Sequence, residues 1–207
     1  MPSNPLYAFL LRTLIWLPLS FVFWYQAANL LNLPLATISK FALQRSTTNL
    51  LTNVELGDHK LTFVTPFEAE IPAAQPQQGK GLIIVEINPL IYGYSFPLLI
   101  ALLFAVEGLS VSWSKLLIAY VGLLPFQAWG VCFEFLKTVA FELGPTVAMQ
   151  VNFPQWTREG IALGYQFGSL ILPPISTAVL WIAMNRNFLN RLLDRPQQVT
   201  AHKSQTH

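Results

Sequence analysis

The sequence predicts a mainly α-helical membrane protein with four transmembrane helices and a small extracytoplasmic β-unit between the first two. Of the 207 residues, 53% are hydrophobic and only 11% are charged, whereas soluble proteins average about 25% charged residues. Four apolar stretches have nearly the length that crosses a bilayer. A segment of alternating polar and apolar residues after the first stretch indicates strands.

The second apolar stretch is the one around which the rest of the chain is organised. Residues 86–108 read EINPLIYGYSFPLLIALLFAVEG, and residues 90–106 contain no charge. A helix of that length spans about 26 Å, close to the hydrocarbon thickness of a bilayer. Tyrosine favours the membrane interface, because its ring is apolar and its hydroxyl is polar. We therefore interpret this as the point where the chain enters the membrane, marked by Asn88, Pro89, Tyr92 and Tyr94.

The N-terminal region, residues 1–34, is predicted to contain the first span at residues 13–31. We interpret this span as an uncleaved anchor, because no clean small-residue cleavage site follows it. After Pro34, the spacing of Leu35, Ile38 and Ala42 forms one apolar stripe. Such a stripe indicates either an amphipathic helix on the membrane surface or a continuation of the first span.

The predicted β-unit completes the segment 35–88. Residues 53–56 and 60–65 alternate on either side of a Gly57-Asp58 turn, and residues 82–87 supply a third strand. A polar loop rich in proline precedes the third strand. So short a unit cannot bury a large core, and we expect it to lean on the membrane surface or on a partner.

The remaining spans are predicted at residues 116–136 and 161–184, so that residues 89–184 form a three-helix membrane bundle. Residues 185–207 form a basic cytoplasmic tail, whose end we expect to be disordered.

Charge in the short loops predicts the orientation of the chain. With four spans both termini share one side of the membrane, and the cations expected there are Arg12, Lys115, Arg186, Arg191, Arg195 and Lys203. The opposite short loop holds Lys137 and Arg158. The positive-inside rule then predicts cytoplasmic termini, a multi-pass protein of the bacterial inner membrane and an extracytoplasmic β-unit.

Composition excludes several classes of function. The net charge of +2 is small and dispersed, so nucleic acid is not an expected partner. The single cysteine excludes an intramolecular disulfide and a cysteine-rich metal site, and the three histidines lack the spacing of metal ligands. We expect no metal and no cofactor.

Three glycines recur every fourth residue at the start of the last span: Gly160, Gly164 and Gly168. Glycines on one ridge let two helix backbones approach closely in lipid. We favour packing within the chain, against the first or third span, over an interface between chains. Gln127 and Gln166 could add hydrogen bonds across helices.

Glu134 and Lys137 place charge at the outer end of the third span. Their spacing is that of an ordinary ion pair on a helix surface, which we favour over a functional site. Together with Gln127 and Gln166 they form a predicted polar patch. One alternative function is therefore the handling of a lipid or a small solute.

Cys132 raises a different alternative, an extracytoplasmic thiol peptidase or transpeptidase that also uses Arg158 and His59. A nucleophilic thiol needs a nearby base or cation. Nothing in the sequence brings His59 to Cys132, so we favour an inert buried cysteine.

Several stretches resemble one family of small bacterial membrane proteins. The most specific are NPLIYGYSFPL at residues 88–98, QAWG at residues 127–130 and ALGYQ at residues 162–166. Similar segments include LLRTLIWLPLSFVFWY at residues 10–25 and WTREGIALGYQFGSLILPPIS at residues 156–176. Together they are similar to the exosortase H-associated membrane proteins.

The resemblance implies an accessory protein in the inner membrane of Gram-negative bacteria, acting beside a membrane-embedded sorting transpeptidase. Exosortases use a cysteine with an arginine and a histidine on nearby spans. This chain has Cys132 but no histidine in any predicted span, which favours an accessory over an enzyme. We therefore expect a non-enzymatic protein that contacts an exosortase-like partner, or the partner's substrate, through its β-unit.

Overall fold

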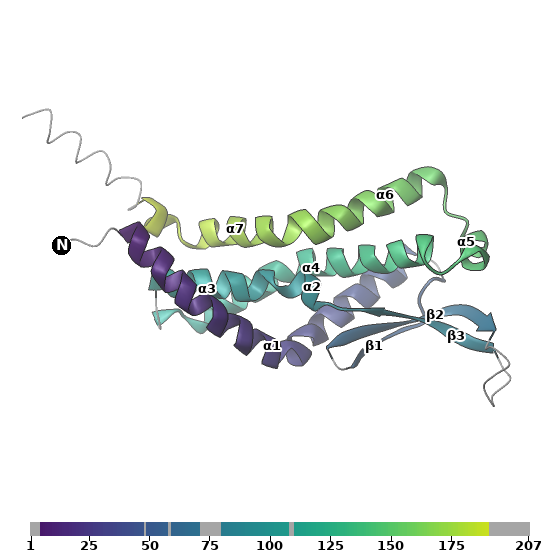
Figure 1. Cartoon of the computed structure of the whole chain (residues 1–207), viewed down its shortest axis with the longest axis horizontal. Coiled ribbons are helices and arrows are strands. Elements are labelled where there is room, and N and C mark those ends of the chain that lie inside the picture. Colours follow the sequence, from purple (N-terminus) through teal and green to yellow (C-terminus); the bar gives the residue numbers. More distant parts are fainter. Residues whose placement is uncertain (1–4, 48, 58, 71–79, 108–109, 191–207) are drawn as a thin grey trace, which may run out of the picture. The chain divides into compact units, whose positions relative to one another are not determined.

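The computed structural model describes residues 5–47, 49–57, 59–70, 80–107 and 110–190. Most of these residues are helical, and one small sheet follows the first helix (Figure 1). The elements in chain order are α1 (Pro5–Ser46), β1 (Asn53–Gly57), β2 (Lys60–Glu70), β3 (Lys80–Ile87), α2 (Leu90–Gly93), α3 (Ser95–Glu107), α4 (Trp113–Phe141), α5 (Pro145–Val151), α6 (Gln155–Gln166), the π-helix η2 (Phe167–Ile171) and α7 (Leu172–Met184). Most of the polar loop before β3 and the end of the basic tail lie outside the described residues.

Among the residues that the structure describes, three helical segments are long and apolar enough to cross a membrane: Leu6–Ser46, Trp113–Phe141 and Gln155–Met184. The last of them joins α6, η2 and α7 into one rod. The expected second span, Leu90–Val106, is a shorter apolar helical stretch. Leu99, Ala101 and Leu103 on α3 have no exposed surface. A helix enclosed in this way faces protein rather than lipid, so its length need not match the bilayer by itself.

The first helix continues well past its predicted end at residue 31. It passes Pro34 without a break and ends at Ser46, so residues after Pro34 continue the first helix. The buried stripe consists of Leu35, Ser39 and Leu43, whereas Ile38 of the predicted stripe is exposed. The predicted apolar stripe of Leu35, Ile38 and Ala42 is therefore not the face that the protein buries, because the small polar residue Ser39 is buried and Ile38 is exposed.

The three predicted strands form an antiparallel sheet in the order β1-β2-β3, which confirms the predicted three-stranded unit. β2 is longer than expected, and its pairing with β3 shifts between Val64 and Glu68. Pro66 lies within this shift. Proline has no N–H to donate to a ladder, which is why it is tolerated at such an irregularity.

The turn between β1 and β2 is tighter than predicted, because Gly57 belongs to β1 and pairs with Lys60. Asp58 of the predicted turn lies outside the described residues. His59 has a φ of 63°, the left-handed conformation that two-residue hairpin turns require. Its backbone N–H and its Nδ1 lie 3.1 Å and 2.7 Å from Oδ1 of Asn29 on α1. This contact ties the turn to the first helix.

One face of the sheet is buried against the chain's own helices. Leu61, Phe63, Val85 and Ile87 form this face, and the rings of Phe63 and Phe135 of α4 lie 5.1 Å apart. The expectation that the unit leans on the membrane surface or on a partner is therefore corrected for this face. It leans on α4 and α1.

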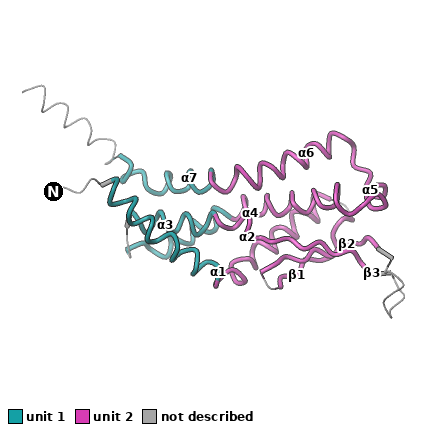
Figure 2. The backbone as a smooth tube through the Cα atoms, viewed as in Figure 1, with its two compact units in different colours: residues 1–25, 95–123, 175–207 teal, residues 26–94, 124–174 magenta. Residues whose placement is uncertain are grey.

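The chain divides into two compact units, each assembled from separate stretches (Figure 2). Unit 1 comprises residues 1–25, 95–123 and 175–207, and unit 2 comprises residues 26–94 and 124–174. The helices α1, α4 and α7 contribute residues to both units.

Aromatic contacts define how the helices of unit 1 run. Phe9 of α1 lies 5.5 Å from the ring of Trp181 of α7. Trp16 of α1 stacks on Phe104 of α3 at 4.6 Å, and Tyr120 of α4 meets Phe96 of α3 at 5.3 Å. Lys115 of α4 lines one cavity together with Val106 of α3 and the residues at the end of α7. The start of α1, the end of α3, the start of α4 and the end of α7 therefore lie at one end of unit 1.

Candidate functional site

Unit 2 is organised around a close approach of α4 to the segment formed by α6 and η2. A Cβ placed on Gly168 would lie 3.1 Å from Cα of Gly130. A Cβ on Gly164 would collide with the ring of Phe133, and one on Gly130 would collide with the ring of Tyr92. Because glycine has no side chain, the backbone at these positions can contact aromatic rings and the backbone of a neighbouring helix.

Trp129 secures this approach. Its Nε1 donates a hydrogen bond of 3.1 Å to the carbonyl oxygen of Gly164. Its ring stacks on Phe133 at 4.6 Å. A Cβ placed on Gly160, the third glycine of the predicted ridge, would have no neighbouring heavy atom within 4 Å. The structure thus places Gly164 and Gly168 against α4 and leaves Gly160 in open space.

The residues predicted at the membrane entrance form the turn into α2. Oδ1 of Asn88 accepts a hydrogen bond of 3.0 Å from N–H of Leu90. The carbonyl of Pro89 accepts one of 2.9 Å from N–H of Gly93. Tyr92 is fully buried and packs on Gly130 of α4, whereas Tyr94 is half-buried. Tyr92 is thus a core residue of unit 2 and does not lie at the surface of the protein.

The predicted charged cluster contains one clear ion pair. Nζ of Lys137 lies 2.7 Å from Oε1 of Glu142, and Oγ1 of Thr138 donates to the other carboxylate oxygen at 3.1 Å. These two donors hold the pKa of Glu142 below its usual value. Lys137 also lies over the ring of Tyr165, 4.8 Å from its centroid. Its closest acidic partner is thus Glu142 rather than Glu134.

The other members of the predicted polar patch face different surroundings. Gln127 is buried. Glu134 is half-buried with its Oε2 enclosed, and its carboxyl lies close to the hydroxyl of Tyr92. Gln166, at the end of α6, is exposed. Gln127 and Glu134 therefore belong to the interior of unit 2, and Gln166 to its surface.

The three candidate catalytic residues have separate partners. Sγ of Cys132 is buried and lies 3.8 Å from the carbonyl oxygen of Ser39. His59 contacts Asn29. Arg158 lies over the ring of Phe141, 4.9 Å from its centroid, beside an open cavity of about 430 Å³. These contacts do not bring the three side chains together. Within the described residues, no group of three or more His, Cys, Asp and Glu side chains could hold a metal ion.

The outer face of the sheet carries exposed apolar side chains on β3. Leu82 and Ile84 are 52% and 54% exposed. Next to them, Lys60 and Glu86 form an ion pair of 2.7 Å across the strands, and this hydrogen bond raises the pKa of Lys60. β3 is an edge strand, because the strand order places β2 on one side of it and no other described strand on the other.

Two contacts carry no signal in the sequence. They are the hydrogen bond from Trp129 to Gly164 and the contact of Asn29 with the turn at His59. The exposure of Leu82 and Ile84 follows from their alternation with Val85 and Ile87, which the sequence shows. The sequence does not show which face of the sheet is covered, because that depends on where Phe135 of α4 lies.

A family model described as exosortase H-associated membrane protein matches residues 3–188 of this chain. No curated protein and no solved structure gives a significant match.

Proposed function

We propose that this chain, which belongs to the exosortase H-associated membrane proteins, is a non-enzymatic accessory that binds an exosortase-type membrane protein through its sheet. The observation that carries the proposal is the family match over residues 3–188, which includes the sheet and the helices from α1 to α7. The family description supplies the class of partner, and the surface of the chain suggests where it binds.

The edge strand β3 is the surface best suited to a protein partner. An edge strand offers unpaired backbone N–H and C=O groups, and another chain can extend the sheet there. Leu82 and Ile84 add exposed apolar area beside these groups. The opposite face of the sheet is held on α4 through Phe63 and Phe135, so the strand is presented on a fixed support.

The proposed orientation has four spans and cytoplasmic termini. Three long helices cross the membrane, and the short apolar stretch Leu90–Val106 is the fourth crossing. In unit 1, α4 runs antiparallel to α3, because Tyr120 meets Phe96 near the start of α3 and Lys115 shares a cavity with Val106 at its end. The first part of α1 contacts that same end of α3 through Trp16 and Phe104. The start of α1, the start of α4 and the end of α7 carry Arg12, Lys115 and Arg186, and the positive-inside rule assigns such an end to the cytoplasm. The sheet then lies on the extracytoplasmic side.

Site-specific photocrosslinking in the native membrane tests the proposed surface. A photoreactive amino acid replaces Leu82 or Ile84 in the full chain, and mass spectrometry identifies the adduct. We expect both positions to capture the exosortase-type protein. The matched control is Glu55, which is exposed on β1, two strands away from β3 at about 4.8 Å per strand. It should give a much weaker adduct.

Two results would contradict this surface. Equal capture at Glu55 and Leu82 would mean that the contact is not specific to β3. Capture of an exported substrate, rather than the enzyme, at Leu82 and Ile84 would replace the proposed partner with that substrate.

A further inference from the structure

Unit 1 contains a cavity of about 370 Å³ where three helices end. Val106 closes it at the end of α3, Lys115 at the start of α4, and residues 183–188 at the end of α7. All of its lining residues belong to unit 1. Its lining combines cationic, amide and apolar side chains.

Asn185 shapes the cavity by ending α7. Its backbone N–H and its Nδ2 both donate to the carbonyl oxygen of Trp181, at 3.0 Å and 2.9 Å. Its own carbonyl then accepts hydrogen bonds from N–H of Phe188 and Leu189, at 3.0 Å and 3.1 Å. α7 therefore ends next to the buried residue Asn185, and a further helical turn begins there. This change of direction brings residues 185–187 around the cavity.

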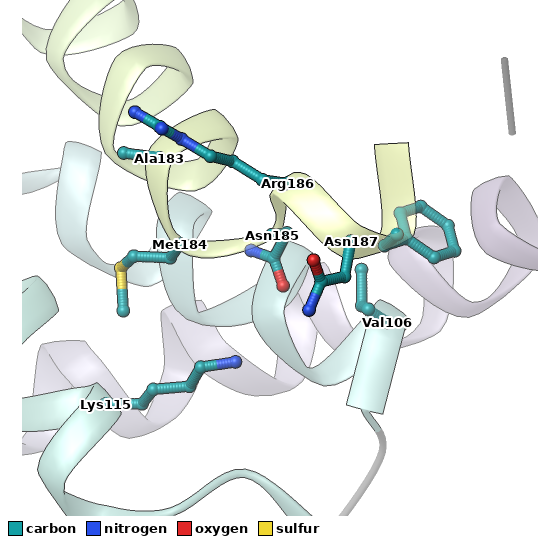
Figure 3. Close-up of a pocket in the computed structure, with 8 residues that line it drawn as sticks. Val106, Lys115, Ala183, Met184, Asn185, Arg186 and Asn187 are labelled. Carbon is teal, nitrogen blue, oxygen red and sulfur yellow. The ribbon is translucent and has the colours of Figure 1, made fainter. Parts of the chain in front are cut away.

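Lys115 and two amides face this space. Figure 3 shows the Lys115 side chain reaching from α4 toward Asn185 and Asn187, while the guanidinium of Arg186 extends away on the other side of α7. A lysine ammonium and the side-chain N–H groups of Asn187 are donors that suit phosphate oxygens, whereas Nδ2 of Asn185 donates to Trp181. Arg186 also lines the cavity, but its guanidinium points away from Lys115 and the asparagines, so Lys115 supplies the positive charge that faces this space.

The surroundings of the cavity point to a lipid as the source of that phosphate. Leu117 and Ile118 follow Lys115 on α4 and are about 60% exposed (62% and 59%). Val179 and Ile182 precede Asn185 on α7 and are exposed as well. Exposed apolar residues on a membrane helix face hydrocarbon, so the polar cavity begins where the hydrocarbon ends. This is the level of lipid headgroups.

We propose that this cavity binds the phosphate of an anionic lipid headgroup. The shared chemistry is a phosphate group with a net negative charge, and the ligand that fits the position best is an anionic glycerophospholipid. Basic pockets between membrane helices commonly hold such headgroups. The inference is independent of the sheet and of the proposed partner, because it uses only residues of unit 1.

Native mass spectrometry of the full chain in mild detergent tests the proposal. The two probes are phosphatidylglycerol and phosphatidylcholine with identical acyl chains. We expect one phosphatidylglycerol to bind about tenfold more tightly than phosphatidylcholine. Lys115→Gln should lower the affinity for phosphatidylglycerol about tenfold, because a hydrogen bond to a charged group is lost, and should reduce the preference for phosphatidylglycerol over phosphatidylcholine. Asn187 is exposed. Asn187→Asp should also lower the affinity for phosphatidylglycerol, because it adds a negative charge at the rim of the cavity.

The matched control is Arg12→Gln, which removes a cation from the same end of unit 1 but not from the lining of the cavity. It should leave phosphatidylglycerol binding unchanged. Melting curves of all variants confirm that each is folded. Equal affinity for the two lipids overturns the proposal, and so does an equal effect of Arg12→Gln and Lys115→Gln. Displacement of phosphatidylglycerol by millimolar inorganic phosphate would overturn the lipid source and assign the cavity to soluble phosphate.

Discussion

Two glycines four residues apart on α6 differ in what surrounds them. A Cβ on Gly164 meets the ring of Phe133, and a Cβ on Gly160 meets nothing within 4 Å. We predict that Gly164→Ala destabilises the protein by about 1–3 kcal/mol, the usual cost of overpacking. Gly160→Ala should stabilise it by up to about 1 kcal/mol, because alanine favours the helix. Thermal unfolding in detergent measures both. Equal effects of the two substitutions would show that Gly164 does not pack against Phe133 of α4.

The reactivity of Cys132 distinguishes a non-enzymatic accessory from a thiol enzyme. Its side chain is buried, and its Sγ faces the carbonyl oxygen of Ser39. We predict that a maleimide reacts with Cys132 in the folded protein at least about tenfold more slowly than in the denatured protein, because a buried thiol is inert. Cys132→Ser should retain function in cells, since its hydroxyl can donate to the same carbonyl. Loss of function at a normal protein level, in both Cys132→Ser and Cys132→Ala, would favour the enzyme.

At the residue scale, the sequence indicated which residue types matter better than which partners they have. The glycine spacing pointed to a close helix contact, and the structure shows contacts for Gly164 and Gly168. The spacing could not show that Gly160 lies beyond the end of that contact. Likewise, Glu134 and Lys137 have the spacing of a pair. Lys137 instead contacts Glu142, which follows the end of α4 and is placed by a turn that spacing does not encode.

The ion pair at the end of α4 makes stability depend on pH. Lys137 and Thr138 lower the pKa of Glu142 in the folded protein. A lowered pKa contributes stability above the unfolded pKa of about 4.3, and this contribution is lost as pH falls through the folded pKa. We predict that Lys137→Met destabilises the protein at pH 7 by no more than about 1 kcal/mol, because the Glu142 side chain is half-exposed. The difference from wild type should shrink below about pH 4.

A double-mutant cycle with Glu142→Gln isolates this pair from the contact between Lys137 and Tyr165. Melting temperatures in detergent at pH 7 and pH 3 give the four corners of the cycle. A coupling between the two residues that is the same at both pH values would contradict the assignment to the carboxylate.

At the element scale, periodicity identified the three strands and the apolar helices but misplaced several ends. α1 runs on to Ser46 because helical periodicity continues through Pro34, and a proline reads as a stop although its neighbours can satisfy the freed groups. The last rod contains η2, where N–H of Leu172 bonds to the carbonyl oxygen of Phe167. Pro173 and Pro174 follow directly and cannot donate N–H groups. The sequence shows these prolines but not the π-turn that precedes them.

At the scale of the whole molecule, the sequence predicted a membrane protein with a β-unit but not the support of that unit. A β-unit as short as residues 53–87 suggests an external support, because it cannot bury a large core of its own. Only the structure shows that the support is internal, through Phe63 on Phe135 and His59 on Asn29. Contacts of this kind join residues far apart in the chain, and a single sequence carries no signal for them.

Whether α3 crosses the membrane decides the topology of the chain, and three exposed positions test it. In a Cys132→Ser background, single cysteines replace Glu55 on β1, Ser112 before α4 and Met149 on α5, all exposed. A membrane-impermeant maleimide is added to intact cells with a permeable outer membrane. Four crossings with cytoplasmic termini predict labelling at positions 55 and 149, and at position 112 only after the inner membrane is opened. If α3 did not cross, positions 55 and 112 would agree and position 149 would differ, because α4 would then be the second crossing. Labelling at position 112 alone would keep four spans and reverse their orientation, which would contradict the positive-inside assignment.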